Sequence, residues 1–191
     1  GVAGDNVVEI NSSARLIFEG VTLWGNASAK PSKMLFFDYN PVVFATTAVV
    51  IRDVIIDGTA NTDCYDYGIY WSDTYGNGSE VGYFNVTINK FSENAWTLPG
   101  SQQKAHIMYN CSFNGGWDGT VGHAGGKYGV FAGGGVATPG TGGSYQYLGG
   151  SASSVTESAF VADYPNDPIV ISSVQSENCY RFFGGPSNTA T

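Results

Sequence analysis

The chain contains few basic residues: eight Lys and Arg against sixteen Asp and Glu among 191 residues, for a net charge of -8. Nucleic acids and anionic membrane surfaces both require a basic face on the protein. No apolar run approaches the roughly 20 residues that a membrane-spanning helix needs. The sequence therefore predicts no nucleic-acid partner and no insertion into a membrane.

Cysteine and histidine are also scarce. The three cysteines, Cys64, Cys111 and Cys179, are an odd number and lack the spacing of metal ligands. No Ser-His-Asp order, glycine-rich phosphate loop or zinc motif occurs. We therefore expect no metal and no cofactor, and we expect His106, within a strand-like segment, to be structural.

What the chain does contain is a repeated phrase of two short apolar stretches joined by a polar corner. In one copy the stretches are Val49-Val50-Ile51 and Val54-Ile55-Ile56, with Arg52-Asp53 between them. The corners of the five copies are Gly20, Asp53, Asn85, Asn110 and Ser173. The steps between them are 33, 32, 25 and 63 residues, the last being about two periods, and such spacing is typical of a solenoid.

A third apolar element follows each copy, at residues 34–37, 67–71, 95–98, 128–131 and 179–183. Three short strands per repeat predict an all-β protein with a right-handed parallel β-helix, in which inward side chains stack from coil to coil. A β-sandwich with regular turns is the alternative. We expect Ile55 to be buried, and we expect one inward column formed by Val21, Val54, Val86, Cys111 and Val174.

The repeat runs through nearly the whole sequence, which predicts a single domain over residues 1–191. A solenoid needs polar capping units. Neither end resembles one, so we expect the chain to be part of a longer protein. Residues 133–150 are rich in glycine, which predicts a loop inserted between strands.

The segment from Asp57 to Glu80 combines carboxylates with aromatic residues. A glycosidase needs two carboxylates facing a sugar, and aromatic rings bind its apolar faces. The predicted catalytic residues are Asp63, Asp66 and Asp73, and the predicted sugar-binding residues are Tyr67, Tyr70, Trp71 and Tyr75. The alternative is that each Asp stabilises a turn while the aromatic side chains pack inside.

A second candidate site is the glycine-rich loop that contains Trp117, Asp118 and His123. Trp117 could bind a sugar ring if it is exposed, and Asp118 adds a carboxylate. His123 could act as an acid or a base near neutral pH. The alternative is a solvated loop with no role in chemistry.

The Val-x-Ile-x-Gly/Asn phrase resembles the pectate-lyase-like superfamily of parallel β-helices, and the Gly, Asn and Tyr content is most similar to bacteriophage tailspike proteins. Asn61-Thr62-Asp63 also matches the Asn-Thr-Asp motif of polygalacturonase-type hydrolases, in which the Asp is catalytic. The resemblance implies an elongated homotrimer on a virion surface or outside the cell. Such a protein binds or cleaves a polysaccharide or cell-surface glycan during host-cell attachment.

Two functional hypotheses follow. The first is a polysaccharide-binding and polysaccharide-degrading β-helix, a glycoside hydrolase with Asp or Glu as acid and base. A largely neutral glycan is favoured over lyase action on a uronate polymer, because a lyase would use Lys or Arg to hold substrate carboxylates. The second is a non-catalytic β-helix that serves as a fibre, an adhesin or a virion structural module.

Overall fold

The computed structural model describes residues 4–10, 15–38, 48–59, 64–72, 79–98, 104–132, 144–162 and 169–184. These residues form fifteen β-strands and one short 3-10 helix, Ala27–Ala29, with no α-helix among them. All strand pairs in this part of the chain are parallel. The protein is therefore all-β, and the β-sandwich alternative, which requires antiparallel pairing, is wrong.

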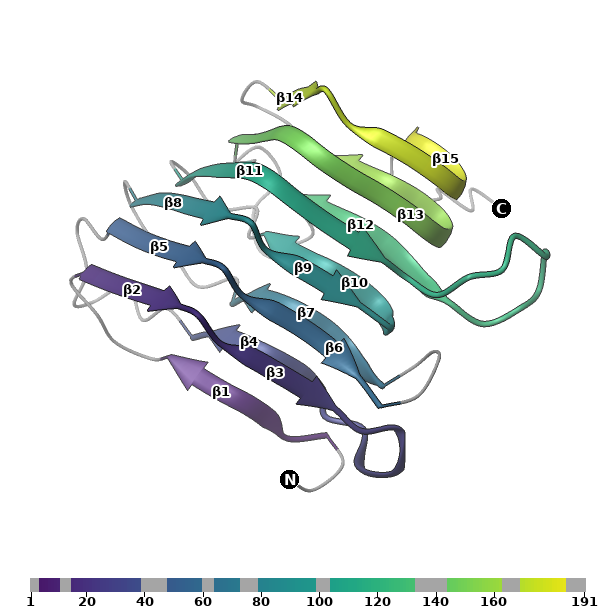
Figure 1. Ribbon diagram of the computed structural model, residues 1–191, viewed down its shortest axis with the longest axis horizontal. Coiled ribbons are helices and arrows are strands. Elements are labelled where there is room, and N and C mark those ends of the chain that lie inside the picture. Colours follow the sequence, from purple (N-terminus) through teal and green to yellow (C-terminus); the bar gives the residue numbers. More distant parts are fainter. Residues whose placement is uncertain are drawn as a thin grey trace.

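The strands form one curled sheet that contains three parallel ladders (Figure 1). The β5 ladder, in front, consists of β2 (Arg15–Glu19), β5 (Ala48–Arg52), β8 (Ser79–Phe84), β11 (Lys104–Asn114), β13 (Ser144–Ala162) and β14 (Ile169–Ser172). The β6 ladder joins β3 (Thr22–Gly25), β6 (Ile55–Gly58) and β9 (Thr87–Asn89) to the later parts of β11 and β13. The β4 ladder, behind, consists of β1 (Asn6–Ile10), β4 (Lys33–Phe37), β7 (Tyr65–Trp71), β10 (Phe91–Leu98), β12 (Gly126–Ala132), the end of β13 and β15 (Gln175–Gly184).

The polar corners between the first two strands of each repeat have left-handed backbone geometry. The values of φ at Gly20, Asp53, Asn85, Asn110 and Ser173 lie between 51° and 65°. Gly, Asn and Asp tolerate this region better than other residues, which explains their recurrence at these positions. The Asn110 side-chain amide donates to Asn85 Oδ1, and that of Asn85 donates to Asp53 Oδ1, both at 2.9 Å. The predicted corners are confirmed, and three of them form a side-chain hydrogen-bond ladder.

The predicted inward column passes through a repeat that the sequence conceals. Cys111 pairs in register with Gly150, and the pairs on either side of Gly150 continue the register to Val174. The 63-residue step therefore divides into 39 (150 − 111) and 24 (174 − 150) residues. A Cβ at Gly150 would lie 1.8 Å from the Cys111 carbonyl oxygen, so this repeat has glycine where the others have Val or Cys.

The core lies inside the curl, where side chains of the β4 ladder meet those of the β5 ladder. Trp71 stacks on Phe37, with ring centroids 4.1 Å apart, and its indole Nε1 donates to the Tyr83 hydroxyl at 2.8 Å. The same hydroxyl lies 3.0 Å from Nδ1 of His106, which is buried on β11. Cys111 is also buried, and burial raises the pKa of its thiol to about 12.

Two expectations about local structure are wrong. Ile55 is 44% exposed, because Val54 and Ile56 point inward and an alternating strand directs the residue between them to solvent. The loop predicted for residues 133–150 is wrong at its C-terminal end, because residues 144–150 belong to β13 and pair with β11. The remainder of that segment, 133–143, lies outside the described residues.

Candidate functional site

The outer face of the β4 ladder carries aromatic residues because β7 and β12 repeat one four-residue phrase. In each phrase two buried residues lie between two outward aromatic residues: the phrases are Tyr67-Gly68-Ile69-Tyr70 and Tyr128-Gly129-Val130-Phe131. The glycines are required by close packing. A Cβ at Gly68 would lie 2.6 Å from the Ala95 carbonyl oxygen, and one at Gly129 would lie 2.0 Å from Phe113 Cζ.

These residues form two ring clusters, which we call together the aromatic face. The rings of Tyr67 and Tyr70 are 5.0 Å apart and nearly perpendicular, and Phe36 of β4 lies 5.9 Å from Tyr70. In the second cluster the rings of Tyr128 and Phe131 are 5.3 Å apart. All five side chains are partly exposed. The Tyr67–Tyr70 pair is edge-to-face, a favourable arrangement of two aromatic rings, and the other two pairs are tilted by 57° and 55°.

Strand β10 separates the two clusters and supplies hydrogen-bonding groups. Asn94 pairs in register with Tyr67 and Tyr128, and Thr97 pairs with Tyr70 and Phe131. The Asn94 side-chain amide donates to Thr97 Oγ1 at 2.9 Å. Two strand spacings separate β7 from β12, about 10 Å. The face therefore alternates rings and polar groups in the direction across the strands.

The charged groups beside the aromatic face are mostly neutralised. Lys30 lies 2.9 Å from an Asp66 carboxylate oxygen, and Lys127 contacts both carboxylate oxygens of Glu93 at 2.8 and 2.7 Å. Lys33 lies over the rings of the first cluster, 4.9 Å from the centroid of Phe36. Burial raises the pKa of Tyr67, with smaller contributions from Glu93, Tyr70 and Asp66.

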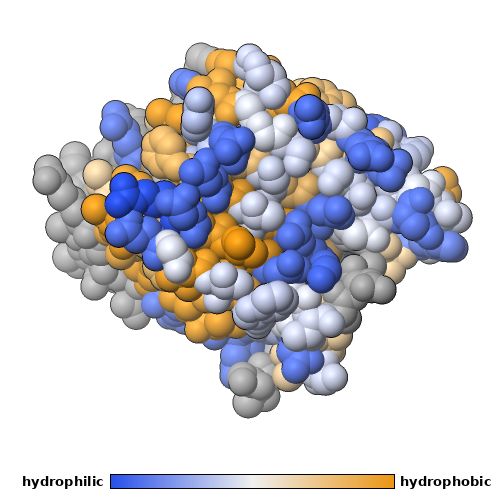
Figure 2. All heavy atoms as spheres, viewed as in Figure 1, coloured by the Kyte–Doolittle hydropathy of each residue, from blue (hydrophilic) through white to orange (hydrophobic). Residues whose placement is uncertain are grey.

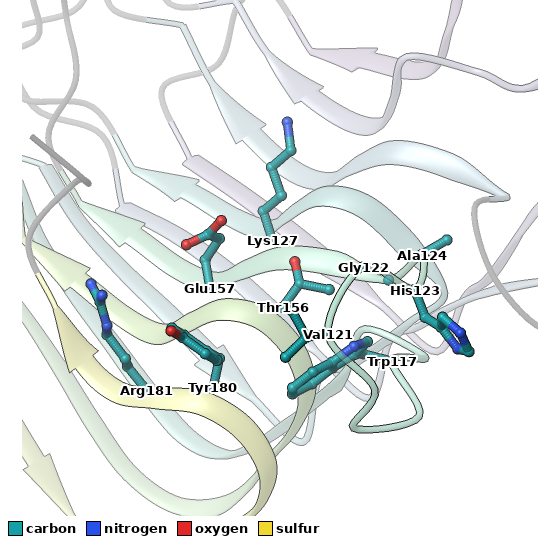
Figure 3. A pocket seen from close by; sticks show the side chains of 11 residues that line it. Trp117, Val121, Gly122, His123, Ala124, Lys127, Thr156, Glu157, Tyr180 and Arg181 are labelled. Carbon is teal, nitrogen blue, oxygen red and sulfur yellow. The ribbon is translucent and has the colours of Figure 1, made fainter. Parts of the chain in front are cut away.

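An open groove of about 460 Å³ adjoins the aromatic face at β12. It lies between the 115–125 loop and strands β12, β13 and β15 (Figure 3). The strand side of the groove is lined by Lys127, Glu157, Tyr180 and Arg181, and the loop side is lined by Trp117 and Val121. The groove therefore combines donors, an acceptor and apolar surface without a strong charge of either sign.

The loop beside the groove is compact, and Trp117 holds it in place. Its indole is 7% exposed and donates to the Thr120 carbonyl at 2.7 Å, so the prediction of an exposed Trp117 is wrong. Asp118 Oδ2 lies 2.8 Å from Nδ1 of His123, and Asp118 Oδ1 accepts from the Thr120 amide. The hydrogen bond with His123, followed by that from Thr120, lowers the pKa of Asp118. The structure thus brings Asp118 and His123 together on an exposed surface.

The other predicted residues fall into three groups. Asp66, Tyr67 and Tyr70 lie on or beside the aromatic face. Trp71 does not, since it is 1% exposed and its ring is covered by Phe37, so it cannot serve as a sugar platform. The remaining predicted residues, Asp63, Asp73 and Tyr75, lie outside the described residues.

Sequence reasoning missed four residues of this face: Phe36, Asn94, Tyr128 and Phe131. Phe36, Tyr128 and Phe131 belong to the third apolar element of their repeats, and Asn94 immediately precedes one. The signal that could have identified Tyr128 and Phe131 is the repeated Tyr-Gly-x-aromatic phrase of β7 and β12. A glycine inside a strand marks close packing on its own side, which leaves the flanking rings to point outward.

The described residues contain no group of three or more His, Cys, Asp or Glu side chains that could hold a metal ion. None of the helical segments in these residues has the length and hydropathy needed to cross a membrane. Comparison with protein-family models, with curated proteins and with solved structures finds no match to this chain.

Proposed function

We propose that the chain is a right-handed parallel β-helix of tailspike type that binds a largely neutral glycan across the aromatic face. The regular register of the three ladders supports the solenoid, since each strand pairs with its counterpart in the next repeat. One observation carries the binding proposal: two ring clusters about 10 Å apart flank a polar strip on adjacent parallel strands.

The chemistry of the face suits a sugar polymer. Aromatic rings contact the apolar faces of pyranoses, while Thr97, which is partly exposed, offers its hydroxyl group to the sugar. Asn94 is 7% exposed and orients that hydroxyl through its hydrogen bond. The groove continues this pattern with Glu157, Tyr180 and Arg181. Glu93 neutralises Lys127, so the groove favours neither an anionic nor a cationic ligand.

Binding is tested by screening neutral and acidic oligosaccharides by calorimetry, followed by substitution on the face. Tyr70→Ala should weaken binding of the selected glycan by about tenfold or more, equivalent to about 1.4 kcal/mol. Trp24→Ala is the matched control, because Trp24 is 60% exposed and lies on β3, away from this face. Equal affinities for both variants and the unsubstituted protein would remove the aromatic face as the binding site.

Hydrolysis is the second candidate function, because Asp66 and Glu93 both lie close enough to Tyr67 to raise its pKa. Two carboxylates beside a ring cluster are what a glycosidase requires. Binding alone is favoured, since each carboxylate is already paired with a lysine, Asp66 with Lys30 and Glu93 with Lys127. Reducing-end release that Asp66→Asn and Glu93→Gln abolish, with affinity retained, would reverse this preference.

A further inference from the structure

The outer face of the β5 ladder differs from the aromatic face because it combines exposed apolar side chains with polar ones such as Glu80 and Gln146. Ile17 is 63% exposed, Tyr109 57%, Val170 41% and Phe84 39%. Hydrophobic residues are visible among hydrophilic ones over this ladder in Figure 2, which shares the viewpoint of Figure 1. We define the apolar strip as six outward residues of this ladder: Ile17, Val50, Phe84, Ile107, Tyr109 and Leu148.

The register joins these side chains into two continuous rows. Ile17 pairs with Val50, and both Val50 and Ile107 pair with Gly82. Gly82 does not interrupt its row, because a Cβ there would lie 2.6 Å from Phe84 Cε2, so the Phe84 ring covers it. In the second row Tyr109 pairs with both Phe84 and Leu148.

We propose that the apolar strip is a contact surface between copies of this chain. The strip itself contains no ionisable carboxylate or amine, although the chain has a net charge of -8. Among its charged neighbours, Arg52 and Glu19 neutralise each other at the end of the second row, and Glu80 is an exposed carboxylate beside the first row. Two copies can therefore approach through this face with little of the repulsion that their acidic surfaces would otherwise cause.

A second copy fits the strip better than a glycan does. Sugars need donors and acceptors beside each ring, and the strip offers few besides the Tyr109 hydroxyl. A two-fold axis parallel to the strands, between β8 and β11, would place Phe84 of one copy on Tyr109 of the other. This arrangement puts the aromatic pair at the centre of the contact, where the residues that dominate binding energy usually lie.

The size of the strip predicts reversible association. It spans four strand spacings from β2 to β13, about 19 Å, and two outward positions along the strands, about 7 Å apart. Apolar patches of a few hundred Å² are often functional, whereas permanent dimers bury more. We therefore expect an equilibrium that shifts within the micromolar range.

Sedimentation velocity of the full chain over a range of micromolar concentrations tests the proposal. The protein should assemble as its concentration rises, and Tyr109→Lys should weaken assembly by about tenfold or more. Trp24→Lys is the control, because it introduces the same charge at a similarly exposed aromatic residue outside the strip. Circular dichroism should show that both variants remain folded, since neither side chain is buried.

A protein that stays monomeric throughout would overturn the proposal, as would equal assembly of the Tyr109→Lys and Trp24→Lys variants. Sedimentation velocity also gives the number of chains in the assembly. The tailspike resemblance implies three. A dimer and a trimer both support the strip as the contact, provided that Tyr109→Lys dissociates them. A direct readout is oxidation of a mixture of the Phe84→Cys and Tyr109→Cys proteins, which should yield a disulfide-linked pair of chains. The absence of that product would argue against the two-fold arrangement.

Discussion

Truncation of Ile56 should destabilise the protein far more than truncation of its neighbour Ile55. Ile56 is fully buried and lies in register between Leu23 and Ile88, whereas Ile55 is 44% exposed. The two residues are chemically identical and adjacent in one strand. A comparison of Ile56→Ala with Ile55→Ala therefore isolates the direction in which each side chain points.

The expected magnitudes follow from burial. Ile56→Ala removes three carbon atoms from the core, about 2.4 kcal/mol at about 0.8 kcal/mol per methylene. Parallel pairing on both sides holds the β6 backbone in place, so the cavity cannot collapse and adds to the cost. We expect a total loss of about 3 to 4 kcal/mol. For Ile55→Ala we expect less than about 1 kcal/mol, because much of its side chain is already in water.

Urea unfolding followed by tryptophan fluorescence measures both values, since Trp71 and Trp96 are buried and report on the core. The slope of the unfolding free energy against urea concentration should be the same in both variants if unfolding remains cooperative. Losses that differ by less than about 1 kcal/mol, or a larger loss for Ile55→Ala, would refute the inward assignment of Ile56.

Three further predictions concern the corners, the loop and the packing. Asn85→Val should lower the urea midpoint and Asn85→Gly should lower it less, since φ at Asn85 is 53° and a β-branched residue is strained there. The pKa of Asp118 is lowered in the folded loop, so its stabilising effect is complete above the ordinary aspartate pKa of 3.8 and is lost as pH falls through the lowered value. Titration of the Trp117 indole N–H signal by NMR should follow that loss, and Asp118→Asn should abolish the transition. Gly129→Val should prevent folding or lower the unfolding temperature sharply, because its Cβ would overlap the Phe113 ring, and circular dichroism on heating measures this.

The sequence by itself determined the repeat and its corners, because both depend on local geometry. A left-handed backbone position restricts the residue to Gly, Asn, Asp or a few others, so the corners are visible one residue at a time. Alternation of apolar residues likewise reveals strands without reference to their partners. These two signals were sufficient to predict an all-β chain and the three elements of each repeat, all of which the structure contains.

Only the tertiary structure decided which aromatic residues face outward. Strands β7 and β12 of the β4 ladder do not alternate strictly, because in each of them two consecutive residues are buried between the outward rings, Gly68-Ile69 and Gly129-Val130. A count of every second residue therefore fails at this ladder. Trp71 consequently lies in the core while Tyr67 and Tyr70 form the surface, and the second ring cluster on β12 becomes part of the same site. The repeat that contains Gly150 could not be recognised from the sequence either. The backbone of Cys111 lies too close for a side chain at position 150, so this repeat lacks the apolar residue by which the others are recognised.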